Sequence, residues 1–147
     1  MDKLLAERKF ILEASQGRVW SLLGRVIIDS LEMERFHARD DRNFNALTKV
    51  KVAFVAITMQ VKGVMVDITP PEALTVLLEV KGLRGIMRLG QKVTFKLGAL
   101  DKDRTELVCK MVSGEMKPAV TAILTPMVKS FGSEVFENIE KRFRQLA

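Results

Sequence analysis

The most strongly patterned stretch of the chain runs from Met116 to Ala147 and reads MKPAVTAILTPMVKSFGSEVFENIEKRFRQLA. Its apolar residues recur at steps of three and four, which places them on one stripe of an α-helix. The stripe consists of Val120, Ile123, Leu124, Met127, Val128, Phe131, Val135, Ile139 and Phe143. A helix of about thirty residues is roughly 45 Å long, so it spans a whole domain and needs a large apolar partner. Pro126 lacks an N–H, so we expect a kink or a break near Leu124 to Pro126.

The composition predicts one globular domain that covers residues 1–147. Of the 147 residues, 48% are apolar and 29% are charged. Charged residues interrupt the N-terminus, and no apolar run is long enough for a membrane span, so we expect a cytoplasmic protein. Cys109 and His37 are the only cysteine and the only histidine. These are too few for a disulfide or for the usual ligands of a metal site, so we expect no metal and no cofactor.

The net charge of +6 raises the question of an anionic partner. Most lysines alternate with apolar residues, which is typical of outward-facing strand positions. The chain has no tyrosine, no dense arginine run and no RNA-binding signature. We therefore expect no nucleic-acid partner, while attraction to an anionic membrane surface stays open.

Upstream of the long helix, alternating patterns predict antiparallel strands. The first strand is expected at Leu4 to Glu13, with Leu4, Ala6, Phe10 and Leu12 on one face and Arg8 breaking the apolar pattern. Six further strands are expected at Met33–Arg39, Phe44–Val52, Val55–Met65, Leu74–Val80, Met87–Leu97 and Leu107–Met111. The turns between the later ones are expected at Ala53-Phe54, Pro70-Pro71, Gly82 to Gly85 and Asp101 to Asp103.

Two short helices are expected after the first strand. Ser15 is a plausible N-cap, and the residues around Val19 to Leu23 are amphipathic. Gly24 is a typical helix terminator, so Val26 to Leu31 is expected to form a separate short helix. The whole order is a strand, two short helices, a run of hairpins and one long helix. This order predicts an α+β class with the helix-grip arrangement, a curved antiparallel sheet of about six or seven strands around the C-terminal helix.

A curved sheet around a helix often leaves a space that the inward residues of both line. The expected lining is apolar and rich in methionine, which suits adaptable binding surfaces, and Gln91 would be a lone polar group for orienting a ligand. The candidate cavity residues are Val52, Met59, Val61, Met65, Leu78, Met87, Leu89, Gln91, Phe95, Met111, Val120, Leu124, Met127, Phe131 and Val135. The alternative is that these side chains pack against one another and leave no cavity.

Short motifs spread over nearly the whole chain carry a family resemblance. They are Phe10 to Ala14, Val19-Trp20-Ser21-Leu22-Leu23, Val50-Lys51-Val52, Val61-Lys62-Gly63, Pro70-Pro71 and Phe136-Glu137-Asn138-Ile139-Glu140. In their order and spacing, the chain resembles the G-subunit family of carbon monoxide dehydrogenase. That family belongs to the SRPBCC superfamily with START lipid-transfer domains, polyketide cyclases and the major birch-pollen allergen. The resemblance implies a START-like fold, a lipid-like or quinone-like ligand and an accessory role towards a molybdenum-containing oxidoreductase.

Three functions are compatible with the sequence. The first is a non-enzymatic carrier or sensor of a hydrophobic small molecule. The second is an enzyme of the polyketide cyclase or aromatase kind, whose acids or bases would have to come from His37, Asp67 or Glu115. No catalytic set can be assembled from these residues, so we expect no catalytic residue. The third is a structural module that dimerises through an outer apolar stripe containing Val64 and Val66.

Overall fold

The chain forms seven strands and two helices. The computed structural model describes residues 3–30, 34–52, 55–82, 87–113 and 118–146. In chain order the elements are β1 (Lys3–Leu12), α1 (Gln16–Ser30), β2 (Glu34–Ala38), β3 (Asn43–Val52), β4 (Val55–Thr69), β5 (Ala73–Gly82), β6 (Met87–Asp101), β7 (Arg104–Ser113) and α2 (Pro118–Leu146).

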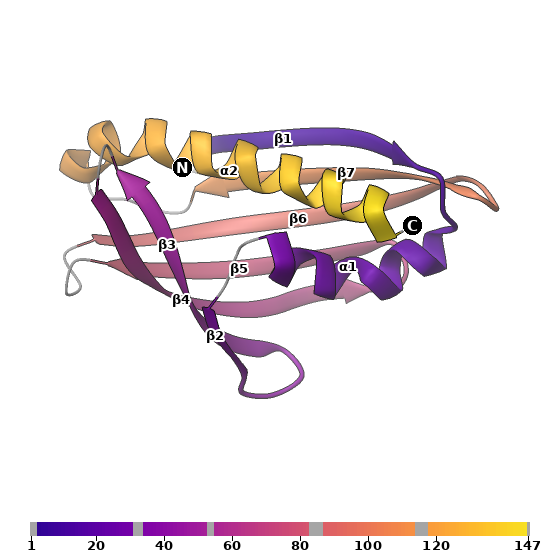
Figure 1. Ribbon diagram of the computed structural model, residues 1–147, viewed down its shortest axis with the longest axis horizontal. Helices are drawn as coiled ribbons and strands as arrows, with labels where there is room; N and C mark the ends of the chain where they lie inside the picture. The colour runs from indigo at the N-terminus through magenta and orange to yellow at the C-terminus, as the bar shows by residue number, and fades with distance from the viewer. Residues whose placement is uncertain (1–2, 31–33, 53–54, 83–86, 114–117, 147) are drawn as a thin grey trace.

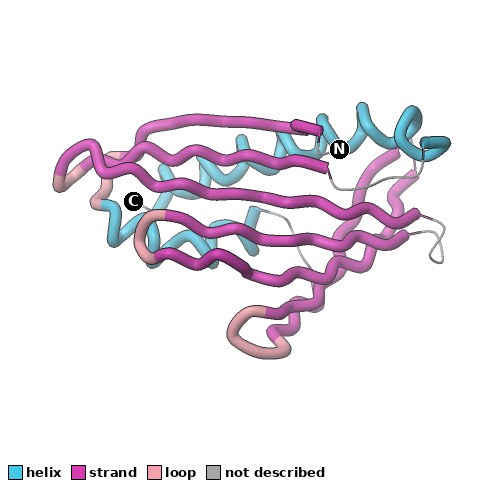
Figure 2. Tube along the Cα trace, turned by 180° about the vertical axis from the view of Figure 1, so that it is seen from behind, coloured by secondary structure: helices cyan, strands magenta, loops and turns pink. Residues whose placement is uncertain are grey.

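All seven strands belong to one antiparallel sheet with the order β1-β7-β6-β5-β4-β3-β2. The sheet is strongly curved, so that β2 and β3 run steeply across the direction of β5 and β6 (Figure 1). Both helices cover the same face, and the opposite face carries no helix in the view from behind (Figure 2). The predicted α+β class and the helix-grip arrangement are therefore confirmed.

The alternating patterns place the strand faces correctly where side chains are described. Met59 and Val61 of β4 are buried, while Gln60 and Lys62, which alternate with them, are exposed. The turns at Pro70-Pro71 and at Asp101 to Asp103 are also found. Residues 53–54 and 83–86 lie outside the described residues, although β3 and β4 pair directly from Val52 to Val55 on either side of the first of these turns.

The prediction of two short helices is wrong, because α1 is one helix of 15 residues. Ser15 caps it as predicted, since its Oγ accepts a hydrogen bond from the N–H of Arg18 at 3.3 Å. Gly24 lies in its interior. An interior glycine costs about 1 kcal/mol relative to alanine. The burial of Val19, Leu23 and Val26 on one stripe outweighs this cost.

A break near Leu124 to Pro126 is not found, because α2 is assigned as one helix of 29 residues, while the alternative of a kink there stays a prediction. An interior proline costs about 3 kcal/mol. The C-terminal half of the helix supplies compensating burial through Val135, Ile139 and Phe143, as the sequence pattern predicted, and through Phe136, which the pattern did not include.

A β-bulge in β1 changes which of its first residues share a face. The register with β7 shifts between Leu4 and Ala6, so Leu4 does not share a face with Ala6 and is 49% exposed, while Leu5 is buried. From Ala6 onwards the predicted alternation holds. Arg8 points to the helix side as the pattern required, and its Nε lies 2.8 Å from Oε1 of Glu140 on α2.

The helix α2 approaches the sheet closely at Gly132. A Cβ atom at this glycine would lie 3.0 Å from Sδ of Met111 on β7 and 3.1 Å from Cβ of Ala6 on β1. Such contacts are at the limit of van der Waals approach. The helix is therefore seated directly on the β1 and β7 side of the sheet.

Polar contacts fix α1 between α2 and the sheet. Gln16 donates to the carbonyl of Leu97 on β6, and Arg18 donates to the carbonyl of Leu146 on α2, both at 2.9 Å. The side chains of Arg142 and Asp29 join the two helices at 3.2 Å. The helix thus has anchors at both of its ends.

We predict that Gly132→Val destabilises the protein by about 1–3 kcal/mol, because the new side chain overpacks the seat of α2. Gly17→Val in α1 is the matched control, since a Cβ at Gly17 meets nothing within 4 Å. Chemical denaturation of both variants measures the difference. Equal stability of the two variants would contradict the close seat of the helix.

A second prediction concerns pH. Burial raises the pKa of the Glu140 carboxyl, but the hydrogen bonds from Arg8 and Arg144 more than offset this, so the pKa lies below its ordinary value of 4.5. A lowered folded-state pKa means that the stabilisation is present above pH 4.5 and is lost as the pH falls through the folded pKa. Glu140→Gln should therefore cost about 1 kcal/mol at pH 7, and the cost should shrink below about pH 4.5.

Glu137→Gln on the same helix is the control for the pH experiment, because the pair of Glu137 with Lys141 is exposed. Urea denaturation between pH 3 and pH 7 gives both free energies of unfolding. The same pH dependence in both variants would refute the role of the contact between Arg8 and Glu140.

Candidate ligand-binding cavity

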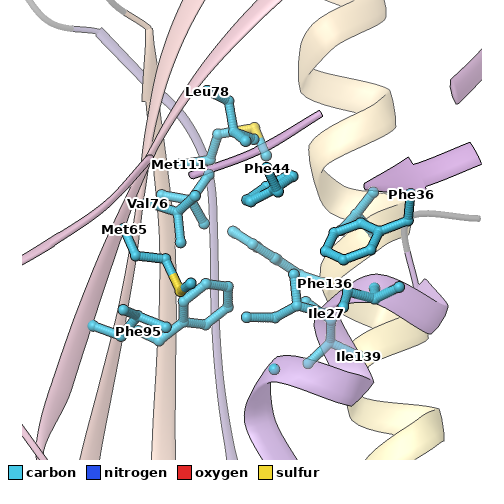
Figure 3. A pocket seen from close by; sticks show the side chains of 15 residues that line it. Ile27, Phe36, Phe44, Met65, Val76, Leu78, Phe95, Met111, Phe136 and Ile139 are labelled. Carbon is cyan, nitrogen blue, oxygen red and sulfur yellow. The ribbon is translucent and has the colours of Figure 1, made fainter. Parts of the chain in front are cut away.

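A cavity of about 100 Å³ lies between the sheet and the two helices. The sheet lines one side, where Met65, Val76 and Phe95 point inward. Ile27, Phe136 and Ile139 face them from the two helices (Figure 3). The described lining residues are Gly24, Ile27, Ile28, Phe36, Phe44, Met65, Leu74, Val76, Leu78, Val93, Phe95, Met111, Val135, Phe136 and Ile139.

The cavity begins where α2 leaves the surface of the sheet. Met111 touches the tight seat at Gly132 and also lines the cavity, so it lies at the boundary between the two. One turn further along α2, Val135 and Phe136 line the space. The rings of Phe136 and Phe95 bridge helix and sheet edge to face, with centroids 6.5 Å apart and planes at 73°. The helix thus approaches the sheet closely at Met111 and Ala6, and the cavity lies beside this contact.

A second aromatic pair stands at the side of the cavity formed by β2 and β3. The ring centroids of Phe36 and Phe44 are 5.4 Å apart, with planes tilted by 30°. Phe44 is buried over Gly63, where a Cβ atom would collide with the ring of Phe44, so glycine makes room for it. Phe36 is 39% exposed although it lines the cavity. Phe36 and the exposed Gly24 therefore mark the mouth, which is the side that faces solvent.

The predicted cavity residues divide into three groups. Five line the cavity, namely Met65, Leu78, Phe95, Met111 and Val135. Met59, Val61 and Gln91 are buried but are not among the described lining residues, so a ligand-orienting role of Gln91 has no support from this geometry. The side chains of Val52, Met87, Leu89, Val120, Leu124, Met127 and Phe131 lie outside what the structure describes, although their backbones belong to β3, β6 and α2.

The sequence pattern missed the contribution of α1 and of the short edge strand. Gly24, Ile27 and Ile28 line the cavity because α1 continues past the glycine. The spacing of Val19, Leu23 and Ile27 carried a signal for this continuation. Phe36 carried a weaker signal, because it lies in the five-residue strand β2, where alternation is hard to recognise.

The described lining contains no titratable side chain. His37 follows Phe36 along β2 and is exposed, and Asp67 is exposed near the end of β4, so neither lines the cavity. Glu115 lies outside the described residues. Burial raises the pKa of the Cys109 thiol to about 12, which keeps it protonated and unreactive. Within the described ranges, no three His, Cys, Asp or Glu side chains are grouped so that they could hold a metal ion.

Neither helix, as far as its residues are described, has a stretch that is long and apolar enough to cross a bilayer. No known family model matches the chain, so the resemblance to the carbon monoxide dehydrogenase G-subunit family stays a prediction. A search of curated proteins likewise gives no match.

Solved structures match the fold over almost the whole chain. A conserved protein from Geobacillus kaustophilus superposes with a TM-score of 0.74 at 16% identity, covering 95% of this chain and 94% of that chain. Norcoclaurine synthase from Thalictrum flavum, a point mutant in complex with a transition-state analogue, gives 0.69 at 15% identity and covers 99% and 94%. A START superfamily protein from Mycobacterium smegmatis gives 0.63 at 11% identity and covers 97% and 98%. The chain therefore has the fold of these START-superfamily and norcoclaurine synthase structures.

Proposed function

We propose that this protein binds a hydrophobic small molecule in the cavity between the sheet and the two helices and carries or senses it without chemical change. The observation that carries the proposal is the cavity itself, whose described lining consists of apolar residues only. Binding would remove apolar ligand surface from water, which contributes about 25 cal/mol per Å² before the cost of immobilisation. The solved structures support a fold that encloses ligands, since one of them holds a transition-state analogue.

Catalysis is the weaker alternative for this chain. Norcoclaurine synthase is an enzyme, so the fold is compatible with chemistry. Acid–base catalysis needs a titratable group within hydrogen-bond reach of the substrate. The described lining offers none, and the exposed His37 and Asp67 are not among its residues. These observations favour binding without catalysis.

The sequence resemblance supports a finer proposal, in which the bound molecule serves a carbon monoxide dehydrogenase-type oxidoreductase or the membrane beside it.

The outer face of the sheet supports contact with a partner or with a second copy of the chain. Val64 and Leu77 stand directly opposite each other on β4 and β5 and are 37% and 43% exposed, while Val66 is half-buried. Exposed lysines such as Lys62 and Lys92 flank this apolar pair.

We predict that Gly24→Leu abolishes ligand binding, because a side chain at this position meets nothing within 4 Å and can extend into the mouth. Toluene, decanol and a short-tailed quinone are suitable uncharged probes. A ligand that binds the native state raises the melting temperature Tm in proportion to its occupancy. At least one probe should raise the Tm of the wild type, and Gly24→Leu should lose this rise.

Gly17→Leu is the matched control, since Gly17 also lies in α1 with open space around it but does not line the cavity. This variant should keep the full rise in Tm. A wild type that none of the probes stabilises would overturn the proposed function, and an equal loss in both variants would place binding outside this cavity.

A further inference from the structure

The proposed function leaves the class of ligand open, and the cavity restricts it. Its volume is about 100 Å³. Sites for drug-sized ligands are commonly about 300–1,000 Å³. An apolar cavity of about 150 Å³ stays dry and binds benzene or xenon. The cavity that the described residues line therefore matches a single ring better than a long acyl chain.

The arrangement of the aromatic wall residues adds a preference for a flat guest. Phe36 and Phe44 form one pair, and Phe95 and Phe136 form the other, so rings line the cavity from β2, β3, β6 and α2. Aromatic rings attract one another in offset or edge-to-face contacts beyond the burial of area alone. A planar aromatic guest between two such pairs can make both kinds of contact, which a saturated ring cannot.

Two methionines in the cavity wall also favour a planar aromatic ligand. Met65 and Met111 line the cavity, and Figure 3 shows both on the sheet side, facing the side chains from the helices. Thioether sulfur makes favourable contacts with aromatic rings, and the unbranched side chain adapts to the outline of a ligand. The sheet side of the cavity thus offers flexible thioether groups beside the rigid rings of Phe44 and Phe95.

The polarity of the wall excludes a charged guest. No described lining side chain contains an oxygen or a nitrogen atom. A buried carboxylate or ammonium group would lose its hydration without a hydrogen bond in return. Among the described lining residues, Phe36 and Gly24 are the exposed ones, so a polar substituent would reach water at the mouth beside them. A ligand with such a substituent would therefore insert its ring first.

From these observations we infer that the cavity selects a small uncharged aromatic ring, of the size of toluene, over saturated rings and long aliphatic chains. The inference rests on the proposed function, because it specifies the ligand class of the same cavity. It differs from the lipid-like ligand that the sequence resemblance implies.

The experiment uses the full-length protein with ¹³C-labelled methionine methyl groups. Met65 and Met111 report on the cavity, and Met59 is an internal control because it is buried but is not among the lining residues. Toluene, methylcyclohexane and decanol are titrated separately. Toluene should shift the Met65 and Met111 signals and leave Met59 in place. It should bind about two- to tenfold more tightly than methylcyclohexane, which is the energy of one aromatic pair expressed as an affinity ratio.

Decanol should leave both reporter signals unchanged at the concentration at which toluene saturates them. Phe36→Leu tests the aromatic contribution without risk to the core, since Phe36 is partly exposed on the edge strand β2. This variant should lower the affinity for toluene by about twofold or more and leave that for methylcyclohexane unchanged.

The two proposals fail in different ways. If methylcyclohexane or decanol moves Met65 and Met111 at concentrations equal to or lower than those of toluene, the inferred ligand class is wrong and the binding function stands. If none of the three compounds moves either signal, the ligand class is wrong, and the proposed function fails with it if the short-tailed quinone also leaves the Tm of the wild type unchanged. A wild-type preference for toluene that persists unchanged in Phe36→Leu would remove Phe36 from the explanation and overturn its part of the inference.

Discussion

The seat of α2 on β1 and β7 is the constraint on which the rest of the structure depends. At Gly132 the helix lies so close to the sheet that an added Cβ atom would lie 3.0 Å from Sδ of Met111 and 3.1 Å from Cβ of Ala6. Because the sheet is curved (Figure 1), contact of α2 on this side leaves a separation over the strands that bend away. α1 fills part of that separation, and its polar anchors to Leu97, Leu146 and Arg142 keep it in place. What remains unfilled is the cavity.

This arrangement divides the interior into two regions with different tasks. Phe143, Leu107 and Cys109 are fully buried and do not line the cavity, so this region supplies stability. Around the cavity the side chains touch on one side only and forgo part of their dispersion contacts. A ligand in the cavity would restore those contacts, so their dispersion energy would contribute to the free energy of binding. One part of the apolar layer thus stabilises the fold, and the part beside it forms the binding cavity.

Much of this fold follows from local pattern, because period and polarity are properties of short stretches. The alternation from Met59 to Met65 identifies the buried face of β4, and the stripe through Val135, Ile139 and Phe143 identifies the buried face of α2. The cavity is harder to derive. Met59 and Met65 both point inward, yet only Met65 lines the space, since this depends on where sheet and helix diverge.

The predictions from the sequence pattern that were wrong share one physical cause. Gly24 is a typical helix terminator, but the tertiary burial of Val26 carries α1 past it. Leu4 alternates correctly with Ala6 in the sequence, but the bulge between them reverses its direction. In both places a long-range contact outweighs a local preference, and the sequence of the segment alone does not contain that contact.

The bulge near Leu4 also affects whether β1 can pair with the edge strand of another molecule. β1 and β2 are the two edges of the sheet, and a straight edge strand invites pairing with the edge of another molecule. The bulge bends β1, and Glu7 and Lys9 add exposed charges along it, while β2 is only five residues long and has its own shift in register. Both edges therefore discourage edge-to-edge strand pairing with another molecule.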